Sequence, residues 1–371
     1  LGSWDFAQIG DVKVFDELTN HASASTEPEL EQLAGGASPL LTHVSSAWKA
    51  FDPIASFGLV APTITRDDLQ AMERIIQSVL GAVDPRLELP REDRWRAAIE
   101  GKIRAHSADL RSGLAKTIAL LAAQGNDTLV GGTSLRGWAQ LMVRALLERA
   151  NQDRSGWLWE SLYDVLGLLA EAAPDQFMDA LEIATATGGV LVGRIFEDSD
   201  DLMSPTSPHV YLLWALETIA WSPDYFGAAV NLIARLAEMD PGGKLSNRPI
   251  STLANLFLPW HPQTGATLAS RNNVLSKLCR RSPDRAWELL QALLPEAHAS
   301  AIEGVGPEFR DWKTAVANKR VTMASYFEGV QHVLALSIEM AAADYSRLPD
   351  LVDKLDDLTT TLRADRKSTR L

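Results

Sequence analysis

Residues 168–184, LLAEAAPDQFMDALEIA, contain the pattern that decides the fold of this chain. A stretch rich in leucine and alanine ends at Pro174, and Asp175 opens a second apolar stretch. Proline is favoured at the first position of a helix, where its missing N–H would have no partner, and an acidic residue there faces the positive end of the helix dipole. The stretch therefore predicts one helix that ends and a second that begins at Pro174.

The same Pro-Asp pattern recurs further along the chain. It lies in residues 217–237, ETIAWSPDYFGAAVNLIARLA, and in residues 278–294, LCRRSPDRAWELLQALL, with a weaker copy in residues 347–358, RLPDLVDKLDDL. Irregular helix pairs that repeat about every 40–60 residues are typical of α-solenoids, and the Pro-Asp copies recur at comparable intervals. We therefore expect an all-α fold in which residues 61–365 form an irregular α-solenoid of HEAT- or TPR-like helix pairs. The alternative is an irregular all-α globule whose helices begin alike by chance.

Residues 1–60 are organised differently. Helical spacing of apolar residues runs over 11–22, and a second short helix is expected over 27–33. Residues 40–51, LLTHVSSAWKAF, break the helical pattern and suit two short strands around a turn. Two short helices followed by a small hairpin is the order of a winged-helix module, so we predict a winged-helix-like adaptor over residues 1–60.

The two ends of the chain have unusual sequences. The chain begins with Leu1 rather than Met, and the final residues 366–371, RKSTRL, are basic and follow an acidic helix abruptly. We expect the chain to be a piece of a longer protein and residues 366–371 to be a non-native tail.

Composition excludes several classes of protein. The 371 residues exceed the usual size of a single core, and the net charge of −13 argues against nucleic acid as a partner of the whole chain. Cys279 is the single cysteine, so the chain can form neither an internal disulfide nor a cysteine-based zinc site. We find no membrane span and no signal peptide, and we expect a cytoplasmic protein.

The motifs that resemble catalytic sites do not fit their templates. Residues 240–246, DPGGKLS, look like a phosphate loop, but that motif needs Gly where Glu238 stands and Ser or Thr where Leu245 stands. The acidic residues 196–201 lack the glycine and glutamate positions of a calcium-binding loop. The seven histidines show no metal-binding spacing. We therefore expect no catalytic, cofactor-binding or metal-binding residue and no cofactor.

Residues 256–270, LFLPWHPQTGATLAS, place a tryptophan and a histidine between two prolines. Pro259 is expected to end one helix, and Thr267 or Ser270 to begin the next, so the stretch predicts an elbow between helices. Aromatic residues in such loops serve either packing or partner binding. The candidate partner surface comprises Trp260, His261, Phe309, Arg310 and Trp312.

Four runs of sequence suggest a family. SPHVYLLWALETIAWSPDYF, IARLAEMDPGGKLSNRP, LFLPWHPQT and EFRDW resemble a repeated helical region of large bacterial STAND-type P-loop NTPases, and the resemblance spans residues 69–362. In that class a winged helix precedes the repeats, and the repeats sense a trigger. The resemblance implies a sensor and scaffold role and no catalytic residue here, because the phosphate loop would lie before Leu1.

The leading hypothesis is a non-catalytic helical-repeat scaffold or sensor within a larger bacterial NTPase-type regulator of antiviral defence or signalling. Its partners would be a trigger protein or other domains of the same parent chain, with oligomers formed through the parent. The first alternative is a structural or oligomerisation module without a ligand site, and the second is a helical enzyme that uses His261. We expect neither a membrane nor nucleic acid as partner, since Glu27, Glu29 and Glu31 make the second N-terminal helix acidic.

Overall fold

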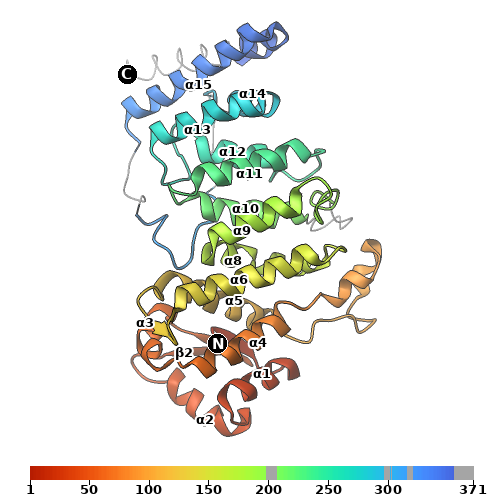
Figure 1. Ribbon diagram of the computed structural model, residues 1–371, viewed down its shortest axis with the longest axis vertical. Coiled ribbons are helices and arrows are strands. Elements are labelled where there is room, and N and C mark those ends of the chain that lie inside the picture. Colours follow the sequence, from red (N-terminus) through yellow and green to blue (C-terminus); the bar gives the residue numbers. More distant parts are fainter. Residues whose placement is uncertain (198–206, 296–300, 302, 316–320, 355–371) are drawn as a thin grey trace, which may run out of the picture. The chain divides into compact units, whose positions relative to one another are not determined.

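The computed structural model describes residues 1–197, 207–295, 301, 303–315 and 321–354. Helices dominate this part of the chain, which confirms the all-α prediction in its general form (Figure 1). Backbone contacts divide the chain into two compact units: unit 1 contains residues 1–212 and 308–310, and unit 2 contains the rest. The tail 366–371 and residues 198–201 of the acidic stretch lie outside the described residues. Within those residues no helix has the length and apolar character needed to cross a membrane.

The first part of unit 1 is a small mixed module. Its elements are β1 (Ser3–Asp5), α1 (Ile9–Thr19), α2 (Ser23–Ala34), β2 (Leu41–Val44) and β3 (Ala47–Ala50). Both predicted helices and the predicted hairpin are confirmed. The sequence did not predict β1, which pairs antiparallel with β3 and makes a three-stranded sheet of order β1-β3-β2.

Aromatic side chains form the core of this module. Trp4 on β1 lies opposite Trp48 on β3, and their rings stack with centroids 6.4 Å apart. Phe15 of α1 packs against Trp4 at 5.4 Å and against Phe6 at 5.1 Å. One helix therefore covers one face of the sheet through ring contacts.

A buried carboxylate joins the module to the helix α5 (Ala108–Gln124). Asp11 of α1 is fully buried and accepts hydrogen bonds from the backbone N–H groups of Asp5 and Ser107, each at 2.9 Å. Ser107 is the N-cap of α5, and its hydroxyl accepts from the N–H of Leu110. The start of α5 is thus fixed relative to β1 and α1.

The remainder of unit 1 is helical. Its elements are α3 (Pro53–Val60), η1 (Ala61–Thr63), α4 (Arg66–Val79), η2 (Pro85–Glu88), η3 (Arg91–Arg96), α5, a hairpin of β4 (Leu129–Val130) and β5 (Thr133–Ser134), α6 (Leu135–Gln152), α7 (Trp157–Ser161), η4 (Tyr163–Val165), α8 (Leu166–Ala172), α9 (Pro174–Thr185) and the first turn of α10 (Pro208–Ala220). Helices α5, α6, α8 and α9 pack side by side and supply most of the buried leucine and alanine (Figure 1).

Unit 2 continues with paired helices. Its elements are the rest of α10, α11 (Phe226–Met239), α12 (Pro249–Phe257), α13 (Leu268–Arg281), α14 (Pro283–Leu293), α15 (Met323–Ala343) and η5 (Tyr345–Arg347). Helices α13 and α14 lie side by side, and α14 also packs on α12 and α15 (Figure 1).

The Pro-Asp pattern marks helix starts as predicted at two of its three main positions. Pro174 and Pro283 are the first residues of α9 and α14. Pro223 differs, because it lies in a turn three residues before α11.

The predicted elbow is confirmed. Helix α12 ends at Phe257, and the hydroxyl of Thr267 caps α13 by accepting from the N–H of Ser270 at 3.2 Å. The elbow is itself packed, since the buried Thr264 donates its hydroxyl to the carbonyl of Ala220 at 2.6 Å.

Candidate functional site

Helix α3 is apolar along its whole length and yet has no buried residue. Its sequence is PIASFGLV, in which Ser56 is the one polar side chain. Asp52 starts the helix by accepting from the N–H of Ala55 at 2.9 Å, with Pro53 in the first turn. Leu59 is 64% exposed. The large exposed apolar side chains on and beside α3 are Phe51, Ile54, Leu59 and Val60.

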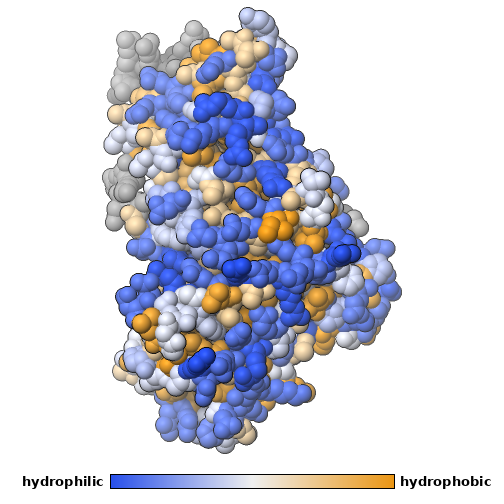
Figure 2. Space-filling model, viewed as in Figure 1, coloured by the Kyte–Doolittle hydropathy of each residue, from blue (hydrophilic) through white to orange (hydrophobic). Residues whose placement is uncertain are grey.

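We call these four side chains the α3 patch. Figure 2 shows hydrophobic residues at the surface in the region where Figure 1 places α3. Isolated apolar side chains are common on protein surfaces, but a contiguous exposed group marks an interaction site. We take the α3 patch as a candidate partner surface of unit 1, which also exposes the apolar side chains of Trp95, Ile99 and Ile103.

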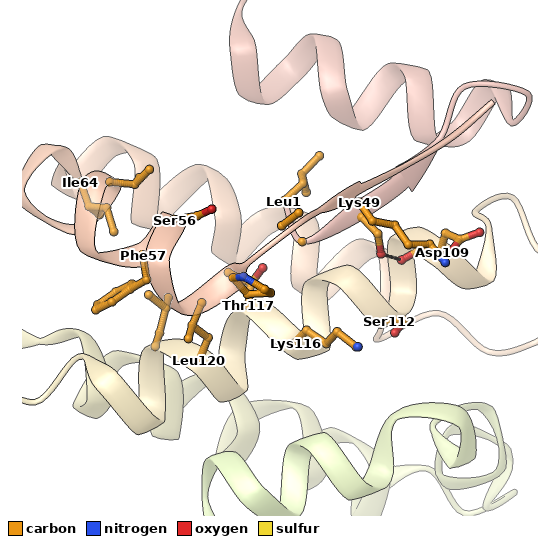
Figure 3. Close-up of a pocket in the computed structure, with 16 residues that line it drawn as sticks. Leu1, Lys49, Ser56, Phe57, Ile64, Asp109, Ser112, Lys116, Thr117 and Leu120 are labelled. Atoms are coloured by element: carbon orange, nitrogen blue, oxygen red, sulfur yellow. Dashed lines mark hydrogen bonds and ion pairs between the residues drawn. The ribbon is translucent and has the colours of Figure 1, made fainter. Parts of the chain in front are cut away.

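A groove with a volume of about 280 Å³ adjoins the patch, between α3, β1 and α5 (Figure 3). Its apolar side is lined by Leu1, Phe57, Val60, Ile64, Leu120 and Leu121. Its polar side is lined by Lys49, Ser56, Asp109, Ser112, Lys116 and Thr117. The volume lies just below the range of about 300–1,000 Å³ for ligand pockets, so the groove suits a few side chains of a partner.

The charged groups of the groove are already paired. Lys49 lies 3.0 Å from a carboxylate oxygen of Asp109, and the ammonium group of Lys116 lies 2.6 Å from Glu308. Both pairs are largely exposed, and such pairs contribute little to stability, about 0–1 kcal/mol. The groove thus offers apolar contact with a nearly neutral polar rim.

One glycine sets the position of the groove wall. A Cβ atom on Gly113 of α5 would lie 2.3 Å from the backbone nitrogen of Ser3, which is far inside contact distance. The hydroxyl of Ser3 donates to the carbonyl of Asp109 at 2.6 Å. The close approach of β1 to α5 therefore depends on the absence of a side chain at position 113.

Three of the five residues predicted as a partner surface lie in unit 2. Trp260 is 38% exposed, and its ring lies 5.9 Å from that of the exposed His261. Trp312 is half-buried and packs edge-on against Tyr225 at 6.0 Å. Among the residues described, no hydrogen bond or ion pair joins His261 to a carboxylate, although the pKa of the Glu303 carboxyl is lowered first by Lys313 and also by the nearby His261.

Phe309 and Arg310 belong to unit 1 instead. Phe309 is only 6% exposed, so its ring is part of the core and is not available on a surface. The half-buried Arg310 donates its Nε to the carbonyl of Glu171 at 2.9 Å and its Nη2 to the carbonyl of Ala172 at 3.3 Å.

The carboxylate of Glu171, which sequence reasoning missed, holds this segment. It accepts from the backbone N–H groups of Glu308 at 2.8 Å, Phe309 at 2.6 Å and Arg310 at 2.7 Å. Burial raises the pKa of the Glu171 carboxyl, and the three N–H donors oppose that rise. A lone acidic residue within the apolar stretch LLAEAAP was the signal that sequence offered.

A second buried glutamate has a similar role in unit 2. Glu217 of α10 accepts from the hydroxyl of Thr252 at 3.0 Å and from the N–H of Val305 at 3.3 Å. Burial raises the pKa of its carboxyl. Both glutamates bind backbone groups of the polypeptide, which is a structural role.

The remaining residues that could take part in catalysis or metal binding also lie in environments typical of structural residues. Burial raises the pKa of the Cys279 thiol to about 11, whereas a nucleophilic cysteine needs a lowered pKa. Asp240, in the loop that resembles a phosphate loop, forms a bidentate ion pair with Arg248. In the described parts of the chain, no group of three or more His, Cys, Asp and Glu side chains has an arrangement that would hold a metal ion.

Comparisons with protein families, with curated proteins and with solved structures gave no match.

Proposed function

We propose that this chain is a non-catalytic helical-repeat scaffold or sensor of a larger bacterial NTPase-type regulator, in antiviral defence or signalling, and that it binds a partner protein through the α3 patch. The observation that carries the proposal is an apolar helix with no buried residue beside an apolar groove. Exposing such a helix to water is unfavourable, by about 25 cal/mol per Å² of apolar surface, so a partner that covers it is favoured.

The N-terminal module supports an adaptor role. Two helices followed by a hairpin, with a first strand that completes the sheet β1-β3-β2, fit the proposed winged-helix-like topology. A nucleic-acid-binding module of this kind would need a basic recognition helix, but helix α2 carries Glu27, Glu29 and Glu31 and no Lys or Arg. Phosphate groups would be repelled there, which favours a protein partner over nucleic acid.

The helix pairs support the repeat architecture. In unit 1, α9 follows α8 and packs on it, and in unit 2, α14 follows α13 in the same way. Successive helix pairs that stack form the extended surfaces by which α-solenoids bind proteins.

A matched pair of surface variants tests the proposal. Leu59→Glu places a charge in the α3 patch, and Ile183→Glu places one on α9, where Ile183 is exposed to nearly the same degree, 62% against 64%. The tagged chain is purified from bacterial cells, and co-purifying proteins are quantified by mass spectrometry. We expect a protein present in fixed ratio to the wild-type chain that is lost with Leu59→Glu and kept with Ile183→Glu.

The same variants separate the two non-catalytic hypotheses. If the patch serves only self-association, light scattering of the purified wild-type chain will show a dimer or larger oligomer that Leu59→Glu dissociates, and no other protein will co-purify. Equal behaviour of all three chains in both measurements would overturn the proposed role of α3.

A further inference from the structure

The segment 308–310 is bound in unit 1 by contacts that resemble the recognition of a peptide. It lies far along the chain from the rest of unit 1, yet it groups with that unit. Three successive backbone N–H groups converge on the Glu171 carboxylate at 2.6–2.8 Å. Hydrogen bonds to an ionised carboxylate are about twice as strong as neutral ones. Because all three donors are backbone groups, these bonds recognise the segment irrespective of its side chains.

Two side chains add selectivity. The ring of Phe309 is 6% exposed, so the site contains an apolar position that accepts an aromatic residue. The guanidinium of Arg310 donates to the carbonyls of Glu171 and Ala172 at the C-terminal end of α8. The last carbonyls of a helix lack intrahelical partners and carry a partial negative charge, so they favour a cationic donor.

Residues outside α8 complete the site. Lys116 of α5 pairs with Glu308 at 2.6 Å, and the side-chain amide of Gln124, at the end of α5, donates to the carbonyl of Phe309 at 3.4 Å. The segment is therefore held along its backbone and through each of its three side chains.

From this arrangement we infer that unit 1 contains a recognition site for a bent peptide segment with the sequence Glu-Phe-Arg, that residues 308–310, which form such a bend, occupy it within the same chain, and that a partner presenting a Phe-Arg segment in the same bend binds there in their place. This inference does not depend on the proposed role of the α3 patch, since it concerns other residues. A segment tethered within the chain has an effective concentration in roughly the millimolar range, so a competing peptide binds well only when the tethered copy is weakened.

The test supplies the peptide as a separate molecule. In the full chain carrying Phe309→Ser and Arg310→Ser, which we call the emptied chain, the tethered segment keeps its backbone contacts but loses the buried ring and the guanidinium hydrogen bonds, so it is displaced more easily. The probe is a fluorescein-labelled peptide with the sequence of residues 304–313, GVGPEFRDWK. Fluorescence anisotropy measures its binding. We expect the emptied chain to bind the peptide about tenfold or more tightly than the wild-type chain does, because the wild-type site is occupied.

Two controls assign the binding to this site. The peptide GVGPESSDWK lacks the two recognised side chains and should bind about tenfold more weakly to the emptied chain. Adding Glu171→Gln to the emptied chain should weaken binding of the original peptide to a similar degree, because an amide can accept through only one of its two terminal atoms. Equal binding by wild-type and emptied chains, or by neither while circular dichroism shows the emptied chain folded, would overturn the inference.

A single substitution tests the inference even if the doubly substituted chain fails to fold. Arg310→Ala alone removes the two hydrogen bonds to α8 and leaves the buried ring in place. We expect it to bind the labelled peptide about threefold more tightly than the wild-type chain does. Unchanged affinity in this folded variant would contradict the inference.

Discussion

At the scale of single residues, buried charged side chains show how this chain is held together. Glu171 and Glu217 bind backbone N–H groups of distant segments, and Asp11 does the same at the start of α5. Each of the two glutamates stands in a stretch whose other residues are largely apolar, which is a signal that sequence can show. The partner of each carboxylate cannot be read from sequence, because it comes from a distant part of the chain.

Arg271 is a buried charge of a different kind. It is 7% exposed, its Nε and Nη1 atoms have no hydrogen-bond partner among the described residues, and burial lowers its pKa to about 10. A buried donor without a partner costs about 1–3 kcal/mol. We expect Arg271→Met to raise the free energy of unfolding by about that amount, because methionine keeps the apolar stem and removes the charge.

Urea unfolding measures this change. Arg280→Met, on an exposed position of the same helix α13, is the control and should leave the free energy of unfolding nearly unchanged. A loss of stability in Arg271→Met would show that the guanidinium has a favourable partner in solution.

Glu217 predicts a pH dependence of stability. Burial raises its pKa in the folded chain, so the folded state binds the proton more tightly than the unfolded state does. Its contribution to stability is therefore complete below the ordinary glutamate pKa, about 4.3, and is lost as pH rises through the higher folded value. We expect the unfolding free energy of Glu217→Gln, relative to wild type, to increase between about pH 4 and about pH 7.

Urea unfolding at a series of pH values tests this expectation. Glu182→Gln, on an exposed position of α9, is the control, and its difference from wild type should stay constant across the series. A wild-type chain that gains stability relative to Glu217→Gln as pH rises would contradict the assigned direction of the shift.

At the scale of elements, local signals predicted helix boundaries, whereas strand pairing and the burial of each helix depend on contacts between distant parts of the chain. Prolines marked the starts of α9 and α14, and Thr267 the start of α13, because these signals act within one turn. Strand β1 went unpredicted because it has three residues and its partner β3 lies more than forty positions later. The exposure of α3 could not be read from a helix whose faces are equally apolar, since its residues suggest a buried helix.

A pair of helix glycines tests the packing of α5 on β1. Alanine is the better helix former by about 0.5–1 kcal/mol, but a Cβ at position 113 would collide with the backbone of Ser3. We expect Gly113→Ala to lower the free energy of unfolding by about 1–3 kcal/mol. Gly167→Ala in α8 meets no atom within 4 Å and should raise it slightly. Thermal unfolding of both variants checks this contrast, and equal effects would show that β1 does not pack closely on α5.

At the scale of the whole molecule, the all-α class was predictable because the repeated apolar spacing dominates the sequence. The membership of residues 308–310 in unit 1 was not, because nothing local in EFRDW shows that Phe309 is buried or that Glu171 binds its backbone. Of the residues predicted to form a partner surface, Trp260 and His261 are exposed and Phe309 is buried, and their role in binding a partner remains a prediction. The solenoid, the winged-helix assignment and the boundary at residue 60 remain predictions.

The most direct test of the proposed partner surface is photo-crosslinking in bacterial cells with a benzophenone amino acid at position 59. Position 183, similarly exposed in the same unit, is the control. The proposal predicts a covalent adduct between position 59 and one partner protein, identified by mass spectrometry, that is absent from position 183. Equal labelling at both positions, or none at position 59, would contradict it.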